Sequence, residues 1–151
     1  MDRDTSERLA WTLLGMVGRI DGYLEVGCGN GWRVRTVRST GIRPALGIER
    51  TVAIRDACVS SAGVLVKDVT KRFDLNNCFE LVTAFDIINY IPPEKYEIFI
   101  GNLLRHTEKW LVLTVSPPIH RLLASKSMVL DHEMTSKLSN FGSYSVYKRV
   151  E

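Results

Sequence analysis

A glycine-rich turn that follows a short apolar run is the feature that most constrains the fold of this chain. Residues 23–26 read as a strand, and Gly27, Gly29 and Gly31 follow it at alternate positions. Glycine permits a positive φ and leaves the backbone bare, so that a ligand can approach where a Cβ would intervene. The turn leads into a helical stretch at residues 32–40, at the carboxyl end of the strand, where open α/β sheets bind ligands. The plain alternative is a glycine turn that only ends a strand.

Short apolar runs alternate with amphipathic stretches along the rest of the chain, which is typical of βαβ units with a parallel sheet. Further strands are predicted at residues 44–48, 64–66, 79–84, 110–115 and 143–150, with residues 128–130 as a weak extra candidate. Helices are predicted at residues 5–17, 52–60, 92–106 and 131–140, and a short helix or a mobile loop at 119–126. The expected fold is a three-layer αβα sandwich around a mostly parallel sheet of about six strands.

Length and composition limit the class of protein. The 151 residues suit one domain, and 45% hydrophobic with 25% charged residues is ordinary for a globular protein. No apolar run is long enough for a membrane span, and the first residues are too polar for a secretory signal. Three cysteines without a CxxC pair indicate free thiols in the cytoplasm, and the histidines lack metal-ligand spacing, so no metal site is expected.

Two acids stand at the ends of the next two strands. Glu49 lies 18 residues beyond Gly31, where a carboxylate can accept hydrogen bonds from both ribose hydroxyls, and Asp68 follows the third strand, placed to accept from an adenine amino group. The alternatives are a surface acid paired with an arginine and a helix cap. Trp32 occupies the third glycine position of the dinucleotide fingerprint and argues against that class of site, and a P-loop ending is absent.

These motifs together resemble those of the class I S-adenosylmethionine-dependent methyltransferases. Glu25-x-Gly27-x-Gly29-x-Gly31 is similar to their first motif, Gly47-Ile48-Glu49 to the second, and Lys67-Asp68-Val69 to the one that contacts adenine. Residues 79–92 resemble the fourth-strand motif of the small-molecule branch, although a histidine often found near Tyr90 and an aspartate near Glu80 are absent. The resemblance covers residues 20–116 and implies a Rossmann-like fold.

The resemblance also implies S-adenosyl-L-methionine as the cofactor and gives each motif a role. Around the methionine portion it places Glu25, Gly27, Cys28, Gly29 and Gly31; near the ribose Glu49 and Arg50; near the adenine Asp68 and Val69; and near the methyl group Phe85 and Asp86. The sulfonium already activates the methyl group, so the protein mainly aligns a nucleophile and a general base is optional.

Three residues are candidates to border the acceptor: Asp86, Tyr90 and His120. The alternative for Tyr90 is a core aromatic residue, and for His120 a solvent-exposed loop residue. The expected reaction is methyl transfer to a nucleophilic O, N or S, with a small molecule favoured as acceptor. The alternatives are a cofactor-binding module with little catalysis, acting as a regulatory or oligomerising partner, and a nucleic-acid methyltransferase.

A basic stretch is the only feature that favours nucleic acid. Arg33, Arg35, Arg38 and Arg43 could follow a phosphate backbone, but such runs are more often a solvated helix face. The Asn-Pro-Pro-Tyr signature of amino-group DNA methyltransferases is absent, because Tyr90-Ile91 separates Asn89 from the prolines. Nucleic acid is therefore not the favoured partner.

The expected organisation is one domain over residues 1–151, made of an N-terminal helix (1–20), a cofactor-binding core (21–116) and a shortened C-terminal part (117–151). The related fold commonly has seven strands, and only residues 143–150 are clearly a strand in the last part. A missing strand predicts either an exposed sheet edge or an edge covered by a partner chain, such as a second copy.

Overall fold

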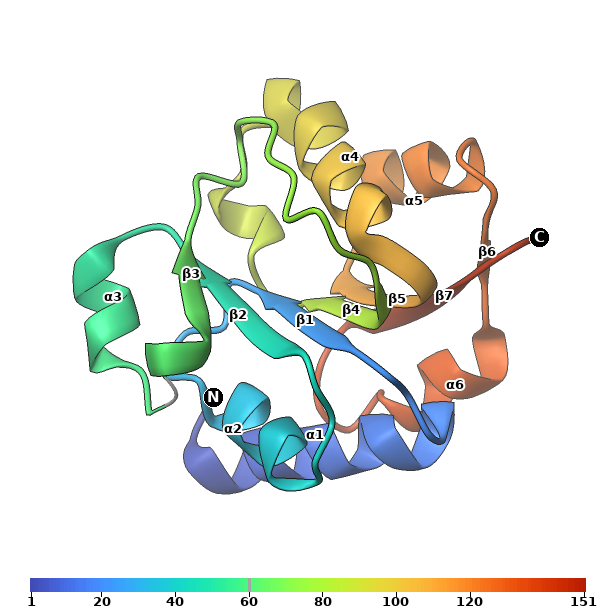
Figure 1. Cartoon of the computed structure of the whole chain (residues 1–151). Helices are drawn as coiled ribbons and strands as arrows, with labels where there is room; N and C mark the ends of the chain where they lie inside the picture. The colour runs from blue at the N-terminus through green and yellow to red at the C-terminus, as the bar shows by residue number, and fades with distance from the viewer. Residues whose placement is uncertain (60) are drawn as a thin grey trace.

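A seven-stranded sheet runs through the molecule. The computed structural model describes residues 1–59 and 61–151. The strands are β1 (Tyr23–Val26), β2 (Ala45–Glu49), β3 (Val64–Val66), β4 (Phe79–Ala84), β5 (Thr107–Thr114), β6 (Met128–Leu130) and β7 (Tyr144–Arg149). Their order in the sheet is β3-β2-β1-β4-β5-β7-β6 (Figure 1). β1 to β5 are parallel, and β7 lies antiparallel between β5 and β6.

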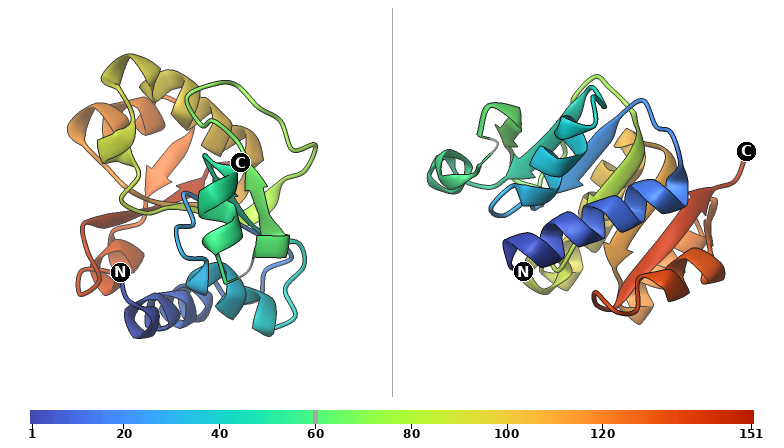
Figure 2. Two further views of the ribbon diagram at one scale, coloured as in Figure 1. Left: turned by 90° about the vertical axis from the view of Figure 1, so that its left-hand side faces the viewer. Right: turned by 90° about the horizontal axis from the view of Figure 1, so that it is seen from below.

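Helices cover both faces of this sheet. The helices are α1 (Arg3–Val17), α2 (Trp32–Ser39), α3 (Val52–Ala57), α4 (Tyr96–His106), α5 (Pro117–Ala124) and α6 (His132–Lys137). α1, α2 and α6 lie on one face, α4 and α5 on the other, and α3 stands beside β3 at one edge (Figures 1 and 2). The predicted three-layer α/β architecture is therefore confirmed. The helix predicted at 52–60 ends at Ala57, and residue 60 lies outside the described residues.

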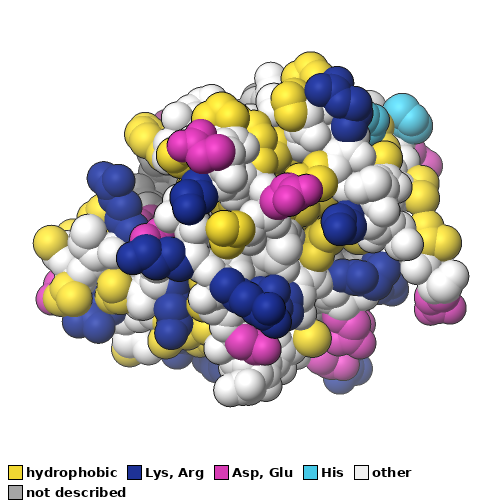
Figure 3. All heavy atoms as spheres, turned by 90° about the horizontal axis from the view of Figure 1, so that it is seen from above, with side chains coloured by type: hydrophobic (Ala, Val, Ile, Leu, Met, Phe, Trp, Pro, Cys, Tyr) yellow, Lys and Arg dark blue, Asp and Glu magenta, His cyan; other side chains and the backbone are white. Residues whose placement is uncertain are grey.

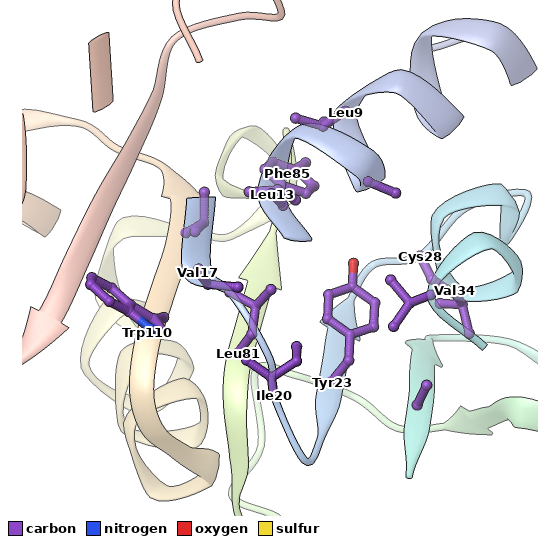
Figure 4. Packing of buried hydrophobic residues seen from close by; sticks show 14 of the residues in the cluster. Leu9, Leu13, Val17, Ile20, Tyr23, Cys28, Val34, Leu81, Phe85 and Trp110 are labelled. Carbon is purple, nitrogen blue, oxygen red and sulfur yellow. The ribbon is translucent and has the colours of Figure 1, made fainter. Parts of the chain in front are cut away.

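The central strands are buried on both sides because successive side chains point to opposite layers. Tyr23 of β1 and Leu81 of β4 pack toward Leu13 of α1 (Figure 4). Their neighbours Leu24 and Val82 pack into the second core, under α4 and α5. This two-sided burial explains why the strands read as continuous apolar runs.

Local signals set the limits of α1, the helix that covers one face of the central strands. The Asp2 carboxylate accepts a hydrogen bond from the Thr5 amide at 2.8 Å, and Gly18 ends the helix with φ 74°. Leu9 and Leu13, one turn apart, are fully buried against the sheet. In the described part of the chain, no helix combines the length and the hydropathy of a membrane span.

The C-terminal edge holds one strand more than expected. Met128–Leu130 pairs antiparallel with β7 and forms the edge of the sheet, so the strand that the sequence left as a weak candidate is present. Its signal was weak because the strand has three residues, of which only Met128 is buried while Val129 is 55% exposed. No partner chain is needed to supply a missing strand, and the predicted oligomer stays a prediction.

Candidate functional site

A cavity of about 400 Å³ opens at the carboxyl ends of the parallel strands. The predicted site residues that line it are Gly27, Glu49, Arg50, Asp68, Val69, Phe85, Asp86 and Tyr90. The other lining residues are Ile48, Ile54, Lys67, Thr70, Ile87 and Ile91, none of which was predicted. Lys67 and Thr70 flank Asp68 and Val69 in sequence, so that motif was a signal for them.

The glycine turn has the backbone that its sequence predicts. The φ values of Gly27, Gly29 and Gly31 are 75°, 55° and 81°. Residues with a Cβ rarely adopt such positive values. A Cβ on Gly27 would come within 2.9 Å of Ile87 Cδ1. Gly31 is the N-cap residue of α2, and the first amide of the helix, that of Trp32, donates to Asn30 Oδ1 at 3.4 Å. The turn therefore presents the bare backbone of Gly27 at the cavity.

Glu49 connects the end of β2 to the glycine turn. Its Oε1 accepts from the Gly29 amide at 2.7 Å, and its Oε2 from the Arg50 amide at 3.3 Å. These two amide donors fix the orientation of the carboxylate at the cavity wall. The alternative was an ion pair with Arg50 or Arg55. Arg50 binds Glu49 through its backbone amide, and the Arg55 guanidinium pairs with Asp56.

Glu25 lies behind the turn and does not line the cavity. It is fully buried, and its Oε1 accepts from Arg33 Nε in a buried ion pair. Burial raises the pKa of the Glu25 carboxyl, and the charge of Arg33 opposes this shift. Glu25 Oε2 has no hydrogen-bond partner. Glu25 thus supports the turn from below through Arg33 and leaves one buried acceptor oxygen open.

The same ion pair removes one arginine from the predicted basic stretch. Arg33 is 8% exposed, donates to Ser6 Oγ at 3.3 Å, and lies over the Phe85 ring at 5.1 Å. Farther along the chain, Arg43 donates to the carbonyl oxygens of Arg38 and Ile42. The four arginines therefore do not form one exposed face. On the opposite side of the molecule, that of α4 and α5 seen in Figure 3, basic side chains also lie between acidic and hydrophobic ones.

Two other predicted residues of the turn, Cys28 and Gly29, are not among the residues that line the cavity. Cys28 is buried, and a Cβ on Gly47 would lie 2.5 Å from its sulfur, so the thiol packs against β2. Burial raises the pKa of this thiol above its ordinary value. Gly29 acts through its amide, which binds Glu49.

Asp68 and Val69 line the cavity after β3, next to Glu49, whose carbonyl oxygen accepts from the Lys67 amide at 2.9 Å. The Thr70 hydroxyl and amide donate to Asp68 Oδ1 at 2.7 and 3.0 Å, and these hydrogen bonds lower the pKa of the Asp68 carboxyl. Val69 is partly buried and packs on the core beneath α4 and α5. The alternative of a helix cap at Asp68 is wrong, because no helix follows before β4. Asp68 instead accepts these hydrogen bonds within a tight turn.

Asp86 occupies a strained position at the end of β4. Its φ is 56°, which is uncommon outside glycine and is often found at functional sites. Its amide donates to Thr114 Oγ1 at 2.8 Å, and the Tyr144 hydroxyl donates to its Oδ2 at 2.8 Å. Burial raises the pKa of the Tyr144 hydroxyl above its ordinary value, and the nearby Asp86 carboxylate raises it further. Thr114 and Tyr144 come from β5 and β7 and carried no sequence signal.

Tyr90 and His120 have different surroundings. Tyr90 is 77% exposed and lies at the cavity, so the alternative of a core aromatic residue is wrong. His120 lies on α5 with Nδ1 2.6 Å from the Tyr147 hydroxyl, and it is not among the lining residues. Within the described residues, no group of three or more His, Cys, Asp and Glu side chains could hold a metal ion.

Comparisons with known proteins place this geometry in a fold. No family model matches the chain, and no curated protein matches it in sequence. Magnesium protoporphyrin IX methyltransferase from Synechocystis PCC 6803, solved with bound S-adenosylmethionine, superposes with a TM-score of 0.70 at 15% identity, over 98% of this chain and 79% of that one. A glycopeptide N-methyltransferase gives 0.71 at 12% identity, over 96% and 90% of the two chains.

A third solved structure superposes on a smaller part of this chain. An amino pentose methyltransferase from Micromonospora echinaspora, involved in calicheamicin biosynthesis, has a TM-score of 0.61 at 23% identity, over 76% of this chain and 50% of that one. Together with the strand order and the antiparallel β7, these matches show that the chain has the fold of the class I S-adenosylmethionine-dependent methyltransferases.

Proposed function

We propose that this chain binds S-adenosyl-L-methionine and transfers its methyl group to a nucleophilic O, N or S of a small-molecule acceptor. The observation that carries the proposal is the contact of Glu49 with the glycine turn at one cavity. The Gly29 amide fixes the Glu49 carboxylate, and Asp68, after the next strand, lines the same cavity. A carboxylate so placed accepts from vicinal hydroxyl groups, as a ribose presents them.

The residues present suit this cofactor. Gly27 leaves space that a Cβ would fill, Glu49 and Asp68 supply acceptors for ribose hydroxyls and an adenine amino group, and Val69 supplies an apolar contact. Glu25, to which the resemblance gives the methionine portion, is buried behind the lining and keeps one oxygen without a hydrogen-bond partner. Acids also suit a ligand that carries positive charge. When bound, the cofactor supplies a methyl group that its sulfonium activates.

Asp86 is the residue we assign to the acceptor. Thr114 and Tyr144 hold its carboxylate at the end of β4, where its oxygens can accept a proton or a hydrogen bond from the attacking group. Tyr90, exposed at the same cavity, would contact the acceptor by its ring. His120 remains a prediction from sequence, and we leave it outside the assigned set because it is not among the residues that line the cavity.

Calorimetry with S-adenosylhomocysteine tests the donor site. A hydrogen bond to a charged group contributes about 1.5–3 kcal/mol, so Glu49→Ala should weaken binding about 10–150-fold. Glu49→Gln keeps an acceptor for the Gly29 amide and should lose less. Glu133→Ala, on exposed α6, is the control and should bind as the wild type does. Equal affinity of Glu49→Ala and wild type would reject the assignment.

Transfer of labelled methyl groups into a cell extract tests catalysis and the size of the acceptor. Label in the small-molecule fraction that disappears in Asp86→Asn supports the proposal. Label in the nucleic-acid fraction would instead support the nucleic-acid methyltransferase. Tight binding of S-adenosylhomocysteine without any transfer would favour the binding module.

A further inference from the structure

The segment between β3 and β4 forms one wall of the cavity without regular structure of its own. Residues 67–78 contain Lys67, Asp68, Val69 and Thr70 of the lining, and no helix or strand. Backbone amides and carbonyls need hydrogen-bond partners when they are shielded from water. Some partners lie within the segment, such as Asp68 for the amides of Thr70 and Lys71, and neighbouring elements supply others. The segment runs beside α4 (Figure 1).

Asn102 of α4 binds three backbone groups of this segment. The side chain is 1% exposed, and its Nδ2 donates to the carbonyl oxygens of Val69 at 3.0 Å and Lys71 at 2.9 Å. Its Oδ1 accepts from the Phe73 amide at 3.2 Å and from Arg105 at 3.1 Å. Two donors and two acceptor sites are the full capacity of an amide side chain. Asn102 therefore binds the backbone of every second residue from Val69 to Phe73.

Other side chains of α4 hold only the far part of the segment. Arg105 donates to the Phe73 carbonyl oxygen at 3.0 Å, and His106 Nε2 accepts from the Leu75 amide at 3.0 Å. Among the hydrogen bonds of the described residues, those of Asn102 are the ones from α4 that reach Val69, which itself lines the cavity. The position of Asp68 and Val69 thus depends on Asn102 more than on its neighbours.

We propose that Asn102 is a positioning residue for the adenine-binding wall of the cofactor site, an inference that rests on the proposed function. Asn102 does not line the cavity and acts through the backbone of Val69 and Lys71. This backbone sets the place of the Asp68 carboxylate, which would accept from the adenine amino group. Loss of the amide donors should therefore reduce the recognition of that amino group specifically, and not only the stability of the chain.

The test compares two ligands, S-adenosylhomocysteine and S-inosylhomocysteine, in which an oxygen replaces the amino group of the base. A hydrogen bond to a charged group changes the binding affinity by about 10–150-fold. The wild type should therefore bind the adenosyl ligand more tightly than the inosyl ligand by about this factor, as measured by calorimetry. Asn102→Asp has the same shape without the Nδ2 donors and should lower the preference to less than about threefold. Asn102→Ser applies the same comparison if the aspartate variant fails to fold.

Two controls separate positioning from general destabilisation. Leu123→Ala removes a fully buried side chain of α5 and should cost stability while it leaves the ligand preference intact. Asn140→Asp changes an exposed asparagine beyond α6 and should change neither quantity. An Asn102 variant that folds and keeps the full preference would overturn the proposal, as would a wild type that binds both ligands equally. A wild type that binds neither ligand would overturn the proposed function and this inference with it.

Discussion

The two walls of the cavity are built in different ways. The glycine wall (residues 27–31 with Glu49) consists of two strand ends and a turn that bind each other directly, as in the hydrogen bond from the Gly29 amide to Glu49. The adjacent loop wall (residues 67–70) belongs to an irregular segment, and the side chain of Asn102 from a distant helix binds its backbone. The glycine wall is further backed by a buried ion pair, and the loop wall by a buried amide.

This difference separates what a motif determines from what the tertiary structure must add. A turn with three positive φ values needs glycine, so the residues of the turn themselves determine its conformation. An irregular segment gains its conformation from groups that bind its backbone, and these can lie anywhere in the sequence. We therefore expect large effects from changes behind the glycine wall and smaller, more specific effects at the loop wall.

The largest effect should come from the ion pair behind the glycine wall. Arg33→Met leaves the buried Glu25 carboxylate without its partner, and breaking a buried pair in this way costs about 3–5 kcal/mol of the free energy of unfolding. Urea denaturation measures this loss. The deficit should be smaller at about pH 5 than at about pH 8, because burial raises the pKa of Glu25 and protonation removes the unpaired charge.

An exposed ion pair is the control for this substitution. Lys137 and Glu133 pair across one turn of α6, with their side chains 52% and 82% exposed. Lys137→Met should change the free energy of unfolding by less than about 1 kcal/mol. If Arg33→Met costs no more than Lys137→Met at neutral pH, the ion pair does not support the glycine wall as described.

A pair of glycine substitutions compares the packing behind the two walls. A Cβ on Gly47 of β2 would lie 2.5 Å from the sulfur of Cys28, so Gly47→Ala should destabilise by about 1–3 kcal/mol through overpacking. Gly101 of α4, beside Asn102, has no atom within 4 Å of its added Cβ. Gly101→Ala should instead stabilise by about 0.5–1 kcal/mol, since alanine favours helix. Thermal or urea unfolding of both variants decides, and a loss for Gly101→Ala would contradict the open packing at α4.

The same contrast explains which parts were predictable from the sequence. The turn and Glu49 were found because glycine spacing and an acid at a strand end are local patterns. Arg33 was placed on a basic face, since a run of arginines is usually solvated and nothing in the run shows that its first member reaches Glu25. Tyr90 could be read as core or as surface, because an aromatic residue after a strand suits both.

Contacts between distant elements left the weakest signals. Thr114 and Tyr144, which hold Asp86, are ordinary strand residues, and the pairing of β4 with β5 and of β5 with β7 brings them to the end of β4. β6 has three residues and therefore no readable alternation. Asn102 did leave a trace, a polar residue between the buried Phe99 and Leu103 of one helix, which indicates a buried hydrogen-bonding role.

The smallest expected effect lies within the loop wall. The Thr70 hydroxyl donates to Asp68, so Thr70→Val should raise the pKa of the Asp68 carboxyl toward its ordinary value, as measured by titration of the carboxyl carbon in NMR. Because the folded-state pKa is lowered, the associated stability is full above the unfolded pKa and is lost as the pH falls through the folded one. The difference between wild type and Thr70→Val should therefore be present at neutral pH and disappear in acid. Thr70→Ser keeps the hydroxyl and should titrate as the wild type does, whereas an unchanged midpoint in Thr70→Val would show that the amide of residue 70 alone holds Asp68.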